Sequence, residues 1–442
     1  MKRERMAARG IVLAVTLFLC WQAQPAAAQD QTQQPAYTIP EYNAFQACRA
    51  ETNAQTRLKC LDDFVGKFPK STLLKYIDQM YWSTYNELKN YAKVVEYADK
   101  YIAESDPKAD VAARVQALYT RCAVFEFAYN PKAPDANDQL SKAKAAAAEG
   151  LKTLESLPKP ENMTDQQFAD QKKPVAALFN NTAGFAELQL KDYPTAATSF
   201  KAALVNVPTD GVAEYRLGVA YLQETPPLSM EGFWALARAV ALKAPGDAQI
   251  KDYLRKQLVR YQQSGCDNLI DSQMNELLQL AAGAPERPAT YSIPSAADLD
   301  KVRQGLNILT VLTDLSAGGD KAKMTWLAVC GSDFPEVVGK VIDVTPGTGT
   351  DAVGLHVFTG ATSDEMEKAT TANMDVKVVG QPEASRLQNA DGVRFSGTLM
   401  GYDPSPFMLH WEKGKVNPED IPPEKKEGQT RKPHKVAKPS GH

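Results

Sequence analysis

From Glu41 to Gly283, apolar residues recur at three- and four-residue spacing, which is the spacing of one face of an α-helix. Prolines interrupt this pattern at positions 69, 107, 131, 158, 208 and 245. Because proline ends or bends a helix, the segments between these positions are typical of paired helices joined by turns. The pattern therefore predicts a mainly α chain, with about five or six stacked helical hairpins over residues 41–283.

The clearest hairpin runs from Ala177 to Asp210, with small residues where two helices would cross and aromatic residues that would fill the gaps beside them. The positions that carry this pattern are Gly184, Tyr193, Ala196, Phe200, Ala203 and Pro208, and the next unit repeats the first half with Leu217, Gly218 and Tyr221. Gly218 follows Gly184 by 34 residues (218 − 184). This spacing resembles the signature of the tetratricopeptide repeat family. The resemblance implies a solenoid that binds peptides or helices of other proteins, and the alternative is a helical bundle without repeats.

A proline-rich linker is expected at residues 284–294, followed by a bridging helix within residues 295–334 that starts at Ala296 and ends at Leu315. Beyond Pro335 the apolar period changes to two, which indicates β-strands. Five such segments lie within residues 335–415, with a short helical stretch between the second and third. They predict a small five-stranded barrel resembling the oligonucleotide/oligosaccharide-binding (OB) type, and a generic β-sandwich is the alternative.

The first 28 residues have the pattern of a secretory signal peptide: four basic residues, an apolar run at positions 11–20 and the small residues Ala26 and Ala28. Cleavage is expected between Ala28 and Gln29. A lipoprotein signal ending at Cys20 is the alternative, and it fits poorly because the large residues Phe18 and Leu19 precede that cysteine. Residues 29–40 are polar and are expected to be a disordered leader. We therefore expect a periplasmic or secreted protein without a membrane-spanning segment.

Removal of residues 1–28 takes away four basic residues and one acidic residue, which leaves 46 basic and 52 acidic residues and a net charge of −6. This mild acidity argues against nucleic-acid binding. Residues 416–442 are expected to be a disordered basic tail, because Glu424–His442 holds six Lys and Arg against two Glu. Such a tail would attach to anionic envelope polymers or lipid head groups, and the alternative is a tail that only keeps the chain soluble.

The sequence contains none of the common phosphate-binding, hydrolase or redox motifs. We therefore expect no catalytic residue, no cofactor and no metal, and the chain is predicted not to be an enzyme. His356 and His410 lie on predicted strands, where two ligands alone make a poor metal site.

Five cysteines follow position 28, at positions 48, 60, 122, 266 and 330, so at least one remains unpaired if the others form disulfides. Cys48 and Cys60 are the candidate pair. They would face each other if the chain turns near Thr52 and Asn53, and the alternative is two buried thiols.

The preferred function from these patterns is a periplasmic scaffold or adaptor that holds other proteins or peptides of the cell envelope. The alternative is a ligand-binding module, in which the OB-like domain binds a glycan or another polymer and the helices serve as a spacer.

Overall fold

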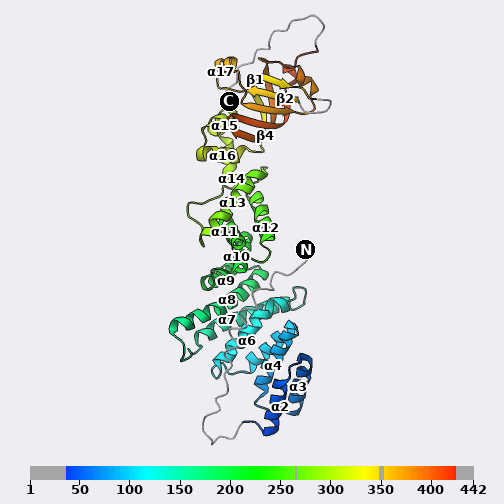
Figure 1. Cartoon of the computed structure of the whole chain (residues 1–442), viewed down its shortest axis with the longest axis vertical. Helices are drawn as coiled ribbons and strands as arrows, with labels where there is room; N and C mark the ends of the chain where they lie inside the picture. Colours follow the sequence, from blue (N-terminus) through cyan, green and yellow to red (C-terminus); the bar gives the residue numbers. More distant parts are fainter. Residues whose placement is uncertain (1–35, 264–265, 348–352, 425–442) are drawn as a thin grey trace. The chain divides into compact units, whose positions relative to one another are not determined.

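The computed structural model describes residues 36–263, 266–347 and 353–424 (Figure 1). The chain divides into two compact units. The first consists of residues 1–253 and 277–288, and the second of residues 254–276 and 289–442. The expected signal peptide, the cleavage site between Ala28 and Gln29 and residues 29–35 of the expected leader lie outside the described residues.

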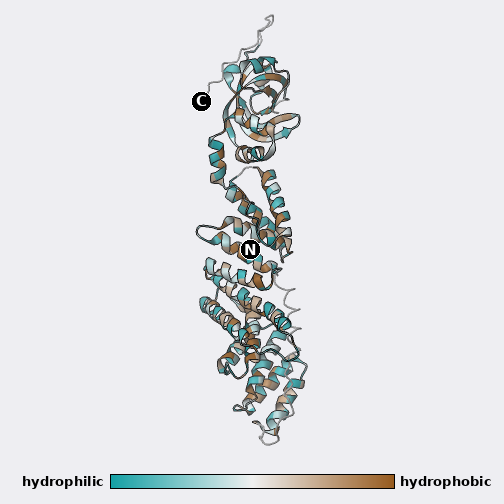
Figure 2. Ribbon diagram, turned by 90° about the vertical axis from the view of Figure 1, so that its left-hand side faces the viewer, coloured by the Kyte–Doolittle hydropathy of each residue, from teal (hydrophilic) through white to brown (hydrophobic). Residues whose placement is uncertain are grey.

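The first unit is a series of helices in which each helix packs against the next (Figure 1). The helices are α2 (Ile39–Ala50), α3 (Ala54–Lys67), α4 (Leu74–Glu87), α5 (Tyr91–Glu104), α6 (Val111–Ala128), α7 (Ala136–Glu155), α8 (Asp165–Gln189), α9 (Tyr193–Asn206), α10 (Gly211–Gln223) and α11 (Ser229–Ala241). Two further helices, α12 (Asp247–Gln262) and α13 (Asp267–Gly283), are divided between the two units. Each of these helices carries both polar and apolar residues (Figure 2), as expected for helices that bury one face.

The chain becomes helical earlier than the sequence analysis predicted. The hydroxyl of Thr38 accepts a hydrogen bond from the backbone N–H of Glu41, and Glu41 bonds back to Thr38 to complete a capping box. Pro40 lies in the first turn of α2, where its missing N–H has no helical partner to lose. Residues 39 and 40 therefore belong to α2, and their assignment to a disordered leader is wrong.

The helices approach closely where one of them carries a glycine. A Cβ atom added to Gly184 of α8 would lie 2.8 Å from the ring of Phe200 on α9, closer than real side chains come. Phe200 is fully buried and also packs with Leu217 of α10. One aromatic ring thus fills the space within one helix pair and contacts the next pair.

Polar contacts also join neighbouring helices. On α6, the buried Arg114 donates from Nε to Glu149 of α7 over 2.7 Å and from Nη1 to the carbonyl of Ile102 at the end of α5 over 2.8 Å. The equally buried Arg121 donates to Asp99 of α5. These arginines stay charged, so burying them requires such partners.

The expected linker at residues 284–294 is partly packed against helices. In the first unit, the indole N–H of Trp234 donates to the carbonyl of Pro285, and Arg287 forms an ion pair with Glu231 at 3.0 Å. These contacts help to cover α11, in which residues 232–239 are all buried. The division between the two units therefore runs through α12 and α13 and again after Pro288, instead of following residues 284–294 as a whole.

The expected single bridging helix is three helices: α14 (Ala296–Gln304), α15 (Ile308–Ala317) and α16 (Gly319–Val329). Gly305 ends α14, and the amide oxygen of Asn307 caps the start of α15. Gly318, at a φ of 72°, turns the chain between α15 and α16. The apolar spacing continues across these breaks because both sides face one core, and for this reason the sequence analysis wrongly predicted one helix.

Five strands close into a barrel in the order β1-β2-β3-β5-β4. They are β1 (Asp333–Thr345), β2 (Val353–Phe358), β3 (Met374–Val378), β4 (Gly392–Pro404) and β5 (Phe407–Val416), and only the β3–β5 pair is parallel. Helix α17 (Ser363–Lys368) lies between β2 and β3, and short 3₁₀ turns, η2 (Pro382–Arg386) and η3 (Pro418–Asp420), follow β3 and β5. The prediction of a mainly α chain followed by a small five-stranded barrel is confirmed.

The barrel core follows the alternation of the strands. In β2, Val353, Leu355 and Val357 are buried while the residues between them are partly exposed. Trp411 of β5 lies in the centre, with its ring 5.2 Å from that of Phe334 and 5.5 Å from that of Phe395. Residues of α15 and α16, such as Val311 and Val329, belong to the same core.

The start of the expected disordered tail is ordered. Val416 belongs to β5, and the buried Asp420 accepts hydrogen bonds from the backbone N–H and the guanidinium of Arg394 on β4 at 2.8–3.0 Å. Residues 416–421 are thus held against the barrel, and their assignment to the tail is wrong. Residues 425–442, which carry all six basic side chains of the expected tail, lie outside the described residues.

Candidate interaction face of the helical array

Within the first unit, the first helices of three successive pairs, α6, α8 and α10, are in contact. Arg216 of α10 forms an ion pair with Glu126 of α6 through two hydrogen bonds, Nη1–Oε1 at 2.7 Å and Nη2–Oε2 at 2.5 Å. The same guanidinium lies 5.2 Å from the ring centre of Phe185 on α8. One arginine therefore connects three helix pairs through an ion pair and a cation–π contact.

Aromatic side chains surround this contact. The ring of Phe185 meets those of Phe125 and Tyr129 edge to face, at 6.2 and 6.0 Å. Nearby on α8, the amide of Asn181 donates to Asp210, the residue that caps the start of α10. Arg216 and Glu126 keep 17% and 30% of their side-chain surface, so the connected first helices present a partly exposed aromatic and polar surface.

Exposed aromatic side chains are few among the described residues, and all of them lie on first helices. They are Tyr42 of α2, Tyr76 of α4 and Phe127 of α6, each exposed by 41–42%. Aromatic side chains on a surface are the groups that contribute most to protein–protein contacts. We call Tyr42, Tyr76 and Phe127 the aromatic triplet.

The residues of the repeat signature shape the interior of the array and do not form a binding site. Ala196, Phe200 and Ala203 are fully buried, and Gly184, Leu217 and Gly218 are also buried. Tyr193 and Tyr221 are half-buried, and Pro208 is exposed in the turn after α9. They set how the helices cross, and other residues supply the exposed surface.

Tyrosines of α4 and α5 stack on one another. Tyr81 lies 4.3 Å from Tyr97 between ring centres, and its hydroxyl donates to Asp62 over 2.6 Å. Burial and the nearby Asp62 raise the pKa of Tyr81, and burial raises the pKa of Tyr97 to about 12. Both hydroxyls stay protonated at neutral pH, and these tyrosines pack α4 against α5.

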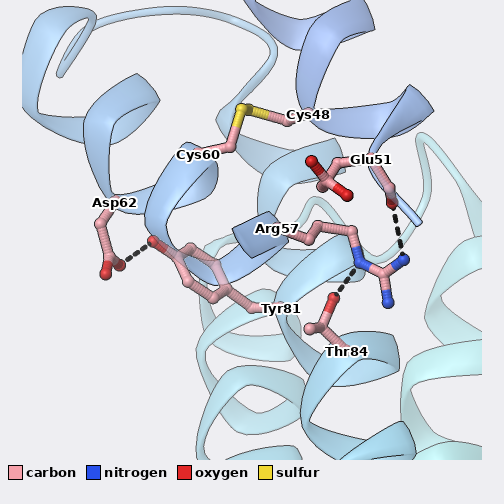
Figure 3. The surroundings of a disulfide bond; sticks show 7 residues. All are labelled: Cys48, Glu51, Arg57, Cys60, Asp62, Tyr81 and Thr84. Atoms are coloured by element: carbon pink, nitrogen blue, oxygen red, sulfur yellow. Dashed lines mark hydrogen bonds between the residues drawn. A yellow bond between two sulfur atoms is a disulfide. The ribbon is translucent and has the colours of Figure 1, made fainter. Parts of the chain in front are cut away.

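The structure joins Cys48 of α2 to Cys60 of α3 by a disulfide, with 5.4 Å between their Cα atoms (Figure 3). The chain turns between them, where Asn53 caps the start of α3. Beside the disulfide, Arg57 donates to the hydroxyl of Thr84 and to the carbonyl of Glu51 (Figure 3). This disulfide therefore holds the first helix pair, which in turn contacts α4.

A second disulfide, which the sequence analysis did not predict, joins Cys266 to Cys330 in the second unit. These cysteines are 64 residues apart, and spacing alone gave no reason to pair them. Among the described residues, Cys122 of α6 is the free cysteine, and complete burial raises the pKa of its thiol to about 12. A thiol of this kind is not a nucleophile at neutral pH.

His356 and His410 are not on neighbouring strands, because β3 lies between β2 and β5. Both imidazoles instead approach Asp375 of β3, His356 at 3.9 Å and His410 at 3.2 Å. Among the described residues, no group of three or more His, Cys, Asp and Glu side chains is placed to hold a metal ion.

The fold defines the class of the protein: helices packed in series in one unit, and a closed five-stranded barrel in the other. Within the described part of the chain, no helix is both long and apolar enough to span a bilayer. No protein-family model matches the chain, and no curated protein matches it.

Proposed function

We propose that this protein is a periplasmic adaptor of the tetratricopeptide repeat kind, which holds other proteins of the cell envelope and catalyses no reaction. The observation that carries the proposal is the grouping on first helices: α6, α8 and α10 contact one another, and the aromatic triplet lies on α2, α4 and α6. The 34-residue spacing of Gly184 and Gly218 supports the assignment to tetratricopeptide repeats, and residues 1–28 support export.

The partner that fits this face is an extended peptide or a helix of another protein. Its apolar side chains would pack on the aromatic triplet. The two ion-paired residues Arg216 and Glu126 are already satisfied, so we expect them to shape the surface more than to bind the partner.

The test is affinity capture from solubilised cell envelopes with the chain from Gln29 to His442. A triple variant, Tyr42→Ala, Tyr76→Ala and Phe127→Ala, is compared with a control, Val205→Ala and Met400→Ala. The control also removes exposed apolar side chains, from the second helix α9 and from the barrel. We expect the triple variant to lose the captured proteins and the control to keep them. Equal capture by both variants would exclude the aromatic triplet as the docking site.

A second candidate function, binding of a glycan or other polymer by an OB-like domain, is supported by the closed five-stranded barrel with its single parallel strand pair. The same capture experiment distinguishes it, because bound glycan without bound protein favours the barrel as the binding module.

N-terminal sequencing of the exported protein tests the location: a chain that starts at Gln29 supports the periplasmic assignment, and one that starts at a lipid-modified Cys20 contradicts it.

A further inference from the structure

Five side chains, one from each strand, form a row across the outside of the barrel. They are Asp343 of β1, His356 of β2, Asp375 of β3, His410 of β5 and Asp403 of β4. The first four are cross-strand partners one after the other: Asp343 pairs with His356, His356 with Asp375, and Asp375 with His410. Asp403 lies two residues after Gly401, which is the cross-strand partner of His410. Between 30% and 65% of each side chain is exposed. Carboxylates and imidazoles alternate along the whole row, which we call the Asp–His row.

The contacts of His410 determine how many protons its imidazole ring carries. Its Nδ1 lies 3.2 Å from Oδ2 of Asp375, and its Nε2 lies 2.9 Å from Oδ2 of Asp403. An ionised carboxylate only accepts hydrogen bonds, and a neutral imidazole has a single N–H to donate. Both contacts are hydrogen bonds at once only when His410 carries two ring protons and a positive charge.

We propose that the Asp–His row is a proton-operated latch, in which doubly protonated His410 joins β3 and β4 through β5. When His410 releases one proton to solvent, one ring nitrogen presents a lone pair to a carboxylate, and that hydrogen bond is lost. The contact on that side becomes repulsive, and β5 loses one of the two hydrogen bonds that the His410 side chain makes to β3 and β4. This inference is independent of the proposed adaptor function.

Lysines on these strands bind other groups, so the histidines are the cationic partners of the carboxylates in the row. His356 approaches Asp343 at 3.5 Å and Asp375 at 3.9 Å. Lys377 of β3 forms an ion pair with Glu412 of β5 at 2.7 Å. Lys340 of β1 donates to backbone carbonyls at and just after the end of α17. Among the described residues, no Lys or Arg forms an ion pair with the three carboxylates of the row.

The direction of the pH effect follows from the same contacts. Burial by itself lowers the pKa of His410, but the hydrogen bonds and charges of Asp403 and Asp375 outweigh it, and the pKa is raised above its usual value of 6.5. A group whose pKa is higher in the folded state stabilises that state below its unfolded pKa. The stabilisation is therefore complete below about pH 6.5 and disappears as the pH rises through the raised pKa of His410.

The first experiment is an NMR titration of the whole chain with isotope-labelled histidine, which has only four histidines to resolve. The variant His410→Gln assigns the signal. We expect His410 to titrate above pH 6.5 and the variant Asp403→Asn to lower its pKa measurably. The control Asp364→Asn removes an equally exposed carboxylate from α17, and we expect no shift. A pKa of His410 that is the same in Asp403→Asn and in the unchanged chain would overturn the proposal.

The second experiment measures hydrogen exchange of the β5 amides at about pH 6 and pH 8, corrected for the intrinsic pH dependence of exchange. We expect several-fold stronger protection at the lower pH, and we expect this difference to disappear in His410→Gln, because glutamine carries no titrating charge. Equal protection at both pH values in the unchanged chain would overturn the latch even if His410 titrates as expected. More than a third of the side-chain surface of both Asp403 and His410 is exposed, so these substitutions leave the barrel core intact.

Discussion

Arg216 and Glu126 are 90 residues apart in the sequence, yet they form a two-point ion pair that passes over Phe185 of the helix between them. The pair joins α10 to α6, and the guanidinium contacts α8 on the way. Three consecutive helix pairs are therefore coupled by a single side chain. This coupling limits how far the first helices can separate, and thereby the width of any surface that they present.

We expect the pair to stabilise the array through the combined ion pair and cation–π contact. A double-mutant cycle with Arg216→Ala and Glu126→Ala should give a coupling energy of about 1 kcal/mol, because both groups are partly exposed. Hydrogen exchange of the α8 and α10 amides provides the local free energies. The exposed pair Asp138–Lys142 on α7 is the matched control, with an expected coupling of a few tenths of a kcal/mol. Equal coupling in the two pairs would contradict a linking role for Arg216.

Limited proteolysis should give different results with and without a reductant. The segment from Ala289 to Pro294 has no regular secondary structure, so a protease that cuts there separates residue 266 from residue 330 in sequence. The disulfide between Cys266 and Cys330 then holds the two fragments together. We expect one band on a non-reducing gel and two bands after reduction. In the variant Cys266→Ser, the two fragments should separate without a reductant. Their separation in the unchanged chain without a reductant would exclude this disulfide.

Glu214 should make the helical array less stable as the pH rises. Burial raises the pKa of this carboxyl to about 7, although the nearby Arg238 acts in the opposite direction. The pKa of the Glu214 carboxyl is higher in the folded state than in the unfolded state. Its stabilising effect is therefore complete below about pH 4.5 and is lost as the pH rises through about 7. The change is on the order of 3 kcal/mol.

Thermal unfolding of Glu214→Gln at about pH 5 and pH 8 tests this expectation. The variant should show a smaller difference between the two pH values than the unchanged chain. Glu224→Gln, one residue beyond the end of α10, is the control and should keep the full difference. If both variants keep it, the pH dependence arises at another group.

The basic segment at residues 425–442 should bind anionic envelope surfaces in a salt-dependent manner. It carries six Lys and Arg, whereas the chain from Gln29 to Glu424 has an excess of acidic residues. Attraction between exposed charges is screened beyond about 8–10 Å at physiological salt. Sedimentation with isolated envelopes should therefore show binding at low salt that is lost at high salt or on deletion of residues 425–442. Equal binding of the truncated chain at low salt would leave the segment without this role.

The local pattern of the sequence was enough to predict the type and order of most elements. The three- and four-residue apolar spacing predicted the helices, and the alternation after Pro335 predicted the five strands and the short helix between the second and third. These predictions succeeded because the period of burial depends only on local backbone geometry. The same reasoning failed at Gly305, where two helices share one core and the apolar spacing continues across the break.

The sequence did not reveal which distant residues come together. Nothing in the spacing of Glu126 and Arg216 indicated an ion pair across α8. His356, Asp375 and His410 became neighbours only because the barrel places β3 between β2 and β5. Such contacts depend on how helices stack and how strands are ordered, and this is decided by the burial of many side chains at once. Local periodicity thus determined the elements of this protein, whereas the tertiary structure alone decided its ion pairs, its second disulfide and the Asp–His row.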